Sequence, residues 1–517
     1  MGHQHASGRR LALFMAGLVL AHAVMLLWPG HLAITAHEVD VLHATLAALR
    51  LADGQAQHID FITPLGIFAF GPIALFMEYG VSIARAFLAA GLLVAAVLAP
   101  AIWYTAHTRF SPGWGLGFAA TTLIMVMAIV YGGDQGNVSL SMAYNRWSWG
   151  AAFVIVALIV LPGRGPNAWV EPAILGTLLA ALALLKMTFF ATLAPIVFLA
   201  LLLNRDWPGL VLTGMAGLFV GLAATISFGG IAFWQGYAHD LLFVASSDVR
   251  PKPGLDLSAV LAAPAYLPGT VAILAAVVTL RKSGQMGPGL LLLLLTGAFG
   301  FITYQNWGND PKWLILLAFL SAGWAGNAPE TRVFGMAARH VFAAIGIAAA
   351  AIVAPTVINL AISPLRNLMA DPADYAAMLN DPDEAGLLIE RARSFTPTGT
   401  IDLSPTPDPQ GQTEEPQAPL SFAGLALPTC RIQAGYFGIL SEISDGLVAL
   451  GYEDTAPLFV DVTNPLWAIG PFNRLPGEAP WYYGGTAGVH AADILVLPRC
   501  PTSTTTFRAY INALNAS

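Results

Sequence analysis

Residues 11–28 read "LALFMAGLVLAHAVMLLW", an apolar run long enough to cross a bilayer as a helix. Arg9 and Arg10 precede it, and no convincing small-x-small cleavage site follows, so the sequence predicts an uncleaved signal anchor. The rest of the chain has the same character. Its 517 residues are 56% hydrophobic and 10% charged, whereas soluble domains average about 25% charged residues. We therefore expect a polytopic membrane protein. A formal charge of −7 without a Lys/Arg run gives no indication of nucleic-acid binding.

Apolar runs of similar character recur along the chain. They cover 85–104, 113–131, 148–162, 171–185, 189–203, 208–228, 265–280, 286–303, 312–326 and 338–362. Segment 65–80 is shorter and is broken by Gly71-Pro72, so it is expected to be an external interfacial helix. The sequence thus predicts an all-α membrane protein with about eleven transmembrane helices, spanning residues 1–362.

The positive-inside rule orients this bundle. Arg9 and Arg10 predict a cytoplasmic N-terminus, which makes 29–84 an external loop. If 65–80 does not cross, six more basic residues fall in the cytoplasm; these are Arg109, Arg164, Arg205, Arg281, Lys282 and Arg332. The expected location is a bacterial inner membrane with the C-terminal domain in the periplasm.

Three segments follow the last apolar run. The Leu/Ile/Ala spacing predicts a helical connector over 363–397, and the Pro-rich acidic stretch 398–420 predicts a linker. Residues 421–517 predict a small α/β domain with strands in 457–462 and 492–498 and a helix in 438–451. Its apparently exposed aromatic residues could bind an acceptor or form a structural lid. Cys430 and Cys500 are expected to form a disulfide worth about 4 kcal/mol; unrelated buried thiols are the alternative.

The first external loop holds "HEVDVLHATLAALRLADGQAQHIDF", residues 37–61. Its leucine spacing predicts an amphipathic helix over 41–52 on the membrane surface, and Asp53-Gly54 predicts the turn that ends it. Asp40 could cap this helix while Glu38 complements its dipole. Alternatively, one carboxylate acts as a general base toward a substrate hydroxyl. Asp40 is the favoured candidate and Glu38 the second.

The order of a first span, an acidic pair and a short external helix resembles the polyprenyl-phosphate-dependent membrane glycosyltransferases of the GT-C superfamily. A G-x-x-x-x-x-D-F-x-x-P-x-G-like run strengthens the resemblance; its residues here are Gly54, Asp60, Phe61, Pro64 and Gly66. The resemblance implies transfer of a sugar from a polyprenyl-phosphate donor to a hydroxyl of a lipid, glycan or protein, with inversion.

Candidate substrate ligands lie in the external loops. The loop 132–147 occupies the place of the family's second acidic loop, and Asp134 is its candidate acid. Asn145 and Arg146 could bind sugar or phosphate. Trp147 and Trp149 could stack on a sugar or anchor at the interface. A solvated turn is the alternative. This loop has one acid and no D-x-D motif, so a divalent cation is not favoured. The spacing of His37, His43 and His58 matches no tight zinc motif; His43 and Asp60 are expected as substrate ligands instead.

Lys186 is a lone cation inside a long apolar stretch, which makes it a functional candidate. The family resemblance suggests that it binds the donor phosphate; snorkelling at a helix end is the alternative. Arg250 and Lys252 are further phosphate candidates. Gln305 and Asn306 are either sugar ligands or ordinary polar residues at a helix end.

Two other functions compete with glycosyl transfer. A transporter or flippase would have polar residues inside its spans, broken helices and internal repeats, and the sequence has no recognisable repeat. A non-catalytic subunit for assembly or polysaccharide export would tolerate loss of Asp40.

Overall fold

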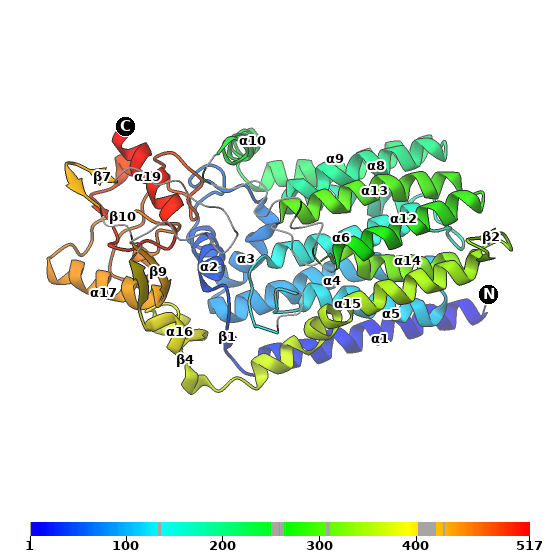
Figure 1. Cartoon of the computed structure of the whole chain (residues 1–517), viewed down its shortest axis with the longest axis horizontal. Coiled ribbons are helices and arrows are strands. Elements are labelled where there is room, and N and C mark those ends of the chain that lie inside the picture. Colours follow the sequence, from blue (N-terminus) through cyan, green and yellow to red (C-terminus); the bar gives the residue numbers. More distant parts are fainter. Residues whose placement is uncertain are drawn as a thin grey trace.

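The computed structural model describes residues 2–132, 136–247, 249, 258, 263, 265–306, 311–401, 420–427 and 430–517. It is mostly helical, with a long bundle and a smaller strand-containing C-terminal region at one end of it (Figure 1). The N-terminus and the hairpin of β2 (Arg332–Val333) and β3 (Met336–Ala337) lie at the opposite end (Figure 1). The two ends of the bundle therefore carry different structures.

Long helices parallel to the bundle axis account for most of the chain. They are α1 (Gly2–Leu27), α4 (Ile83–Arg109), α5 (Pro112–Met127), α6 (Ala143–Val160), α7 (Val170–Leu185), α8 (Met187–Leu203), α9 (Trp207–Ser227), α12 (Tyr266–Lys282), α13 (Met286–Gln305), α14 (Trp313–Asn327) and α15 (Ala338–Leu368). Each coincides with one of the predicted apolar runs. Among the described residues, six helices are long and apolar enough to cross a membrane: α1 (from Gly8), α4, α6, α9, α13 and α15.

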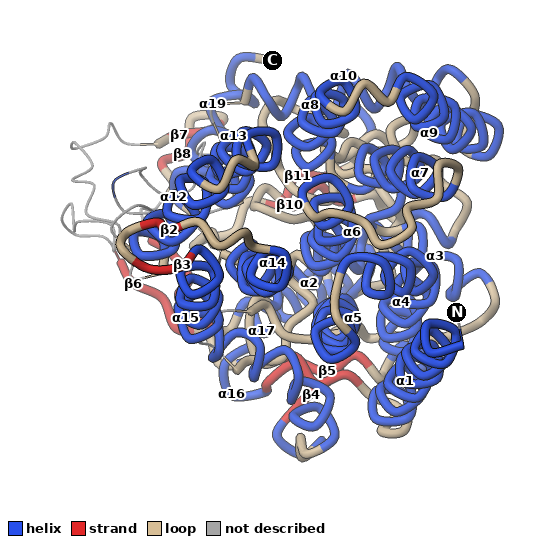
Figure 2. The backbone as a smooth tube through the Cα atoms, turned by 90° about the vertical axis from the view of Figure 1, so that its right-hand side faces the viewer, coloured by secondary structure: helices blue, strands red, loops and turns tan. Residues whose placement is uncertain are grey.

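Helix α6 is the centre of the bundle. It contacts α4, α5, α7, α8, α13 and α14, which surround it in the view along the bundle (Figure 2). Outer helices instead expose large apolar side chains, as α9 does with Leu218, Phe219 and Ile226. Apolar residues on the outside as well as the inside are typical of helices in lipid. At the crossing of α7 and α9, Gly176 lies against the backbone of Thr213, and small residues allow such close approach.

Short helices lie between the bundle and the C-terminal region. They are α2 (Glu38–Ala52), η1 (Ile67–Ala69), α3 (Gly71–Glu78) and α10 (Ile231–Ser246) (Figure 1). Helix α3 has eight residues, which gives a length of about 12 Å against a hydrocarbon core of about 30 Å. Helix α3, the longest helix in segment 65–80, is thus too short to cross a bilayer.

The predicted helical connector over 363–397 is wrong for most of its length. Helix α15 ends at Leu368, and two short strands, β4 (Tyr375–Ala377) and β5 (Leu387–Glu390), precede the short helix α16 (Arg391–Phe395). Two Asp-Pro pairs explain the difference, because proline interrupts a helix. At each pair an aspartate side chain accepts a backbone N–H two residues ahead, within a short 3₁₀ turn: Asp371 from Ala373 and Asp381 from Asp383. Strand β5 pairs with β4 and, in parallel, with β1 (Leu32–Ile34).

The C-terminal region is built from short strands and three helices. Its elements are β6 (Thr398–Ile401), β7 (Ser421–Phe422), β8 (Leu425–Ala426), β9 (Cys430–Ala434), α17 (Tyr436–Ala449), β10 (Pro457–Phe459), α18 (Leu466–Ile469), η4 (Val489–Ala491), β11 (Ile494–Val496) and α19 (Thr504–Ala516). Strands β10 and β11 lie within the two predicted strand segments and pair in parallel, and α17 overlaps the predicted helix. Strand β6 pairs with β9, so the first residues of the predicted linker are part of a sheet; residues 402–419 lie outside the described residues.

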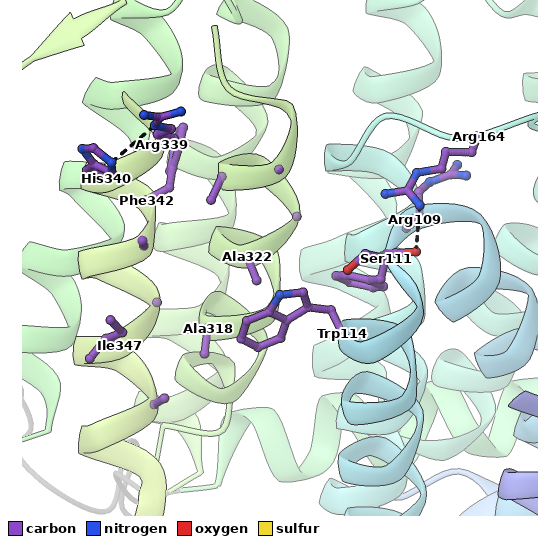
Figure 3. Close-up of a pocket in the computed structure, with 17 residues that line it drawn as sticks. Arg109, Ser111, Trp114, Arg164, Ala318, Ala322, Arg339, His340, Phe342 and Ile347 are labelled. Carbon is purple, nitrogen blue, oxygen red and sulfur yellow. Dashed lines mark hydrogen bonds between the residues drawn. The ribbon is translucent and has the colours of Figure 1, made fainter. Parts of the chain in front are cut away.

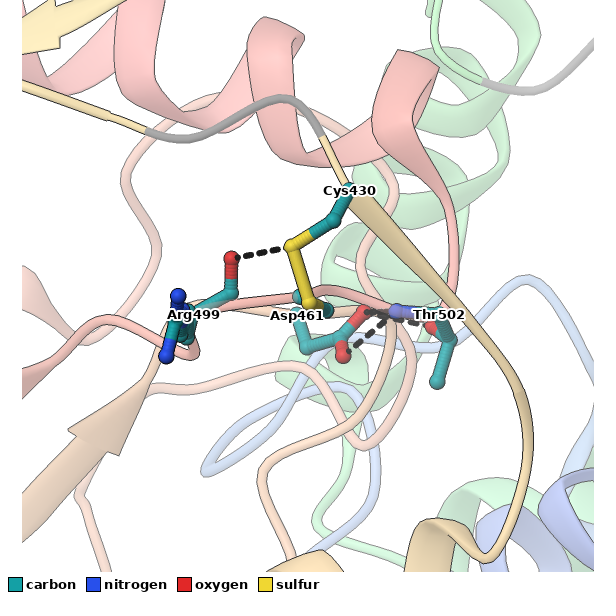
Figure 4. Close-up of a disulfide and its surroundings, with 5 residues drawn as sticks. Cys430, Asp461, Arg499 and Thr502 are labelled. Atoms are coloured by element: carbon teal, nitrogen blue, oxygen red, sulfur yellow. Dashed lines mark hydrogen bonds between the residues drawn. A yellow bond between two sulfur atoms is a disulfide. The ribbon is translucent and has the colours of Figure 1, made fainter. Parts of the chain in front are cut away.

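A disulfide joins Cys430 to Cys500, 70 residues apart. It lies beside the buried Asp461, whose carboxylate accepts the backbone N–H of Thr502 at 2.9 Å and the Thr502 hydroxyl at 2.5 Å (Figure 4). The bridge and this carboxylate together hold the chain after β11 against the rest of the region.

Candidate functional site at the end of the bundle

Helix α2 begins three residues earlier than the amphipathic pattern predicts. His37 precedes its first residue in a left-handed conformation, with φ of 58°, and makes no side-chain cap. Asp40 therefore lies inside the first turn, and its predicted role as the N-cap is wrong. Both Glu38 and Asp40 still lie where the positive end of the helix dipole favours a carboxylate.

The two carboxylates have different partners. Glu38 forms an ion pair with Arg393 of α16, which donates from Nε at 3.0 Å and also from Nη2. Asp40 Oδ2 accepts the hydroxyl of Ser141 at 2.7 Å. Glu38 thus connects α2 to the segment before the C-terminal region, whereas Asp40 faces the loop between α5 and α6.

A second polar cluster brings together three residues that the sequence indicated separately. Lys186 lies at the junction of α7 and α8, and its Nζ donates to Asn145 Oδ1 at 3.0 Å and to Asn306 Oδ1. The ammonium also lies 5.4 Å from the ring of Tyr144. Asn145 lies in the first turn of α6 and Asn306 directly follows α13, so the cluster joins three parts of the bundle at the end that faces α2.

The loop before α6 connects the two groups. Ser141, which contacts Asp40, also accepts Arg146 Nη1 through its carbonyl at 3.5 Å. Arg146 is buried and donates its other terminal nitrogen to the carbonyl of Ala128 at 2.9 Å. It therefore holds the loop in place from within the protein.

Sequence analysis missed Lys312, a buried cation at the start of α14. Its ammonium lies 6.0 Å from the ring of Tyr131, and that ring lies 5.3 Å from the ring of His37, the residue before α2. The signal was present in the sequence, because a single lysine directly before an apolar helix resembles Lys186. Together these residues place two lysines at the same end of the bundle as Asp40.

Other predicted ligands lie apart from this group. His43 is buried between the rings of Phe70 and Trp481, with centroids 5.7 and 5.5 Å away. Asp60 accepts the backbone N–H of Ala56 at 2.6 Å in an exposed turn, and Gln305 accepts the hydroxyl of Thr188. Asp134, Arg250 and Lys252 lie outside the described residues.

The tryptophans predicted to stack on a sugar are part of the bundle core. Trp147 donates to the carbonyl of Val126 at 3.2 Å, and Trp149 packs against Phe189 and Phe299. Both are buried, because they point inward from the central helix α6. They are therefore neither sugar platforms nor interfacial anchors.

The three histidines of the first loop do not converge. His58 is buried, bonds to Asp240 Oδ2 at 2.8 Å and stacks on Tyr237, which fixes the loop after α2 against α10. Asp240 also accepts the backbone N–H of Thr63 at 3.0 Å. Within the described parts of the chain, no group of three or more His, Cys, Asp or Glu side chains could hold a metal ion.

The C-terminal region covers α2 through a buried ion pair that the sequence did not reveal. Arg50 is fully buried and pairs with Glu478, while its guanidinium lies 5.2 Å from the ring of Trp467. Glu478 also accepts Asn464 Nδ2 at 2.5 Å. Burial raises the pKa of Glu478, and the charge of Arg50 opposes that rise. Helix α2 is thus enclosed between two parts of the protein and does not lie on an open surface.

The aromatic residues expected to be exposed in this region are mostly buried. Trp467, Tyr482 and Tyr483 have exposed fractions of 8%, 7% and 2%. They form the contact with α2 and the interior of the region, which favours a structural covering over an open binding platform.

The fold and this group of residues define a mostly helical protein with six candidate membrane-spanning helices among its described residues and a C-terminal region closing one end. No protein-family model, curated protein or solved structure matches the chain.

Proposed function

We propose that the protein is a membrane glycosyltransferase of the GT-C type. It transfers a sugar from a polyprenyl-phosphate donor to a hydroxyl of a lipid, glycan or protein acceptor. The reaction takes place at the end of the bundle that faces the C-terminal region, where Asp40, Lys186 and Lys312 are found.

The observation that carries this proposal is the contact between Ser141 and Asp40. A hydroxyl donating to one carboxylate oxygen fixes the side-chain rotamer, and a general base needs such orientation. Glu38 is bound instead by the guanidinium of Arg393, which contacts both carboxylate oxygens and so leaves neither oxygen available to a substrate hydroxyl. The geometry therefore favours Asp40 over Glu38 as the base.

The chemistry then follows from the charges at this end of the bundle. Asp40 takes the proton of the acceptor hydroxyl, whose oxygen forms a bond to the anomeric carbon on the side opposite to the lipid phosphate. The bond from that carbon to the phosphate oxygen breaks, and its electron pair leaves with the phosphate. Positive charge from Lys186 and Lys312 stabilises the departing phosphate in a site of low dielectric constant.

The proposed topology has eleven spans, one for each long helix of the bundle. The N-terminus and the β2–β3 hairpin share the far end (Figure 1), and the loop arginines belong to the connections at that end. Under the positive-inside rule that end is cytoplasmic. The C-terminal region and Asp40 are then periplasmic, a compartment in which the disulfide between Cys430 and Cys500 persists.

The test compares Asp40→Asn with Glu38→Gln. Both variants replace a carboxylate in the first turn of α2 by its amide. The assay follows radiolabelled sugar passing from polyprenyl-phosphate hexoses and pentoses to lipid and glycan acceptors in vesicles that contain the purified protein. Loss of the base is expected to reduce the rate by about 10²–10⁴-fold, whereas Glu38→Gln should retain most of the activity.

Two results would count against the proposal. Undiminished transfer by a folded Asp40→Asn protein would remove Asp40 from the mechanism. Movement of intact donor lipid across the vesicle membrane, without transfer, would favour the flippase function.

A further inference from the structure

A groove of about 560 Å³ lies at the far end of the bundle, away from Asp40. Figure 3 shows the residues that line it. Its walls come from the start of α5 and from the facing sides of α14 and α15. The walls are apolar, with large side chains from Phe110, Trp114, Phe342 and Ile347 and small residues between them. The small residues are Ala318, Ala322, Gly323, Ala325, Gly326, Ala343, Gly346 and Ala350.

The mouth of this groove is basic. Arg164, on the connection between α6 and α7, lies on one side, and Arg339 and His340, at the start of α15, lie on the other (Figure 3). All three are exposed. Arg109 is also part of the lining, but Glu171 neutralises it at 2.7 Å. The described residues that line the groove include no carboxylate.

Among the described residues, Arg164 and Arg339 each contact an uncharged or neighbouring group rather than a carboxylate. Arg164 donates to the carbonyl of Phe110 at 3.2 Å, and Arg339 Nε donates to His340 Nε2 at 3.3 Å. These contacts hold the side chains at the mouth without cancelling their charge. Two guanidinium groups therefore lie on opposite sides of the entrance to the apolar groove.

We propose that this groove binds an anionic membrane phospholipid, with its phosphate head group between Arg164 and Arg339 and an acyl chain along α14 and α15. The basic residues lie at the end of the bundle, and the apolar wall continues inward from them through Phe342, Ile347 and Ala350. A phospholipid has the same arrangement, with a charged head group followed by an apolar acyl chain. Basic pockets between transmembrane helices are suited to such head groups. The inference requires the bundle to lie in a membrane and does not depend on the proposed sugar transfer.

The test uses the full-length protein after lipid removal, titrated with phosphatidylglycerol or phosphatidylcholine and observed by native mass spectrometry. Each basic residue near an anionic head group contributes about fivefold to affinity. The double variant Arg164→Gln/Arg339→Gln should thus lose about 25-fold in affinity for phosphatidylglycerol. Its affinity for phosphatidylcholine should stay unchanged.

A matched control removes two charges elsewhere at the same end. Arg281 and Lys282 end α12 and do not line the groove, so Arg281→Gln/Lys282→Gln should retain the preference for phosphatidylglycerol. A third variant, Ala322→Phe, narrows the groove at a side chain that lines it (Figure 3), and it should weaken the retention of both lipids. Size-exclusion elution and helical circular dichroism establish that each variant is folded.

Several results would overturn the proposal. Equal affinity of the wild-type protein for the two lipids would mean that the arginines do not recognise a head group. Equal losses in the two double variants would indicate attraction to the whole basic end of the bundle. A dimer abolished by Ala322→Phe would identify the occupant as a second copy of the chain.

Discussion

Replacing Arg50 by methionine is expected to loosen the C-terminal region from α2. The guanidinium is fully buried, pairs with Glu478, donates to Gln55 Oε1 at 2.9 Å and lies against the rings of Phe61 and Trp467. Methionine fills much of the same volume but leaves the Glu478 carboxylate buried without its counter-ion. Removing one partner of a buried ion pair costs about 3–5 kcal/mol.

The same change has a defined pH dependence. Burial already raises the pKa of Glu478 above its ordinary value, and Arg50 opposes that rise, so the variant raises the folded-state pKa further. A group whose pKa is higher in the folded state contributes most stability below its unfolded pKa, about 4.3 for glutamate. The Arg50→Met protein should therefore be most stable near pH 4 and lose stability as the pH rises toward 7.

Amide hydrogen exchange in α2 and in residues 457–478 measures this local opening. Two further variants serve as comparisons for Arg50→Met. The double variant Arg50→Met/Glu478→Gln should lose less free energy of opening than the two single variants added together, by at least about 2 kcal/mol. Asp53→Asn removes the neighbouring pair with Arg474, in which Asp53 is 51% exposed, and should cost about 1 kcal/mol at most. Unchanged exchange in Arg50→Met, or strictly additive effects, would refute this account.

Two further predictions concern other parts of the molecule. Burial raises the pKa of Asp461 from 3.8 to about 6, so wild-type stability should fall between pH 4 and 6 relative to Asp461→Asn in paired thermal unfolding scans; parallel profiles would contradict this. Gly176→Ala places a methyl group against the Thr213 carbonyl at the crossing of α7 and α9, whereas Gly214→Ala meets no atom. Unfolding in detergent should therefore show a loss of about 1–3 kcal/mol for the first variant and almost none for the second.

The long helices could be predicted from the sequence because each rests on a local property. A run of apolar residues of bilayer length needs no distant partner to identify it, and each predicted run coincides with one observed helix. The sheet formed by the connector and β1 could not be predicted from such a local property. The strands β1, β4 and β5 have three or four residues each, too few for an alternating pattern, and β5 pairs with residues far away in the chain. The two Asp-Pro pairs were a usable local signal against a helix.

The candidate site was predictable in its residue types but not in its pairings. Lys186, Asn145 and Asn306 were each identified as polar residues at apolar boundaries, and only the fold brings them together. Arg50 interrupts the apolar face of α2, which signals a buried charge, but its partner is 428 residues later. Sequence position alone cannot identify a partner at that separation.

The contacts of α2 also set an order of events in biogenesis. Strand β1, which leads into α2, pairs with β5, Glu38 pairs with Arg393 and Arg50 pairs with Glu478, so these three partners all follow the last long helix. During synthesis from the N-terminus, α2 emerges long before the residues that enclose it. The ion pairs of α2 with the C-terminal part of the chain are therefore completed last, after the whole bundle has been synthesised. A chain that stops within 402–419 would have the entire bundle and the partner of Glu38, but it would leave Arg50 without Glu478.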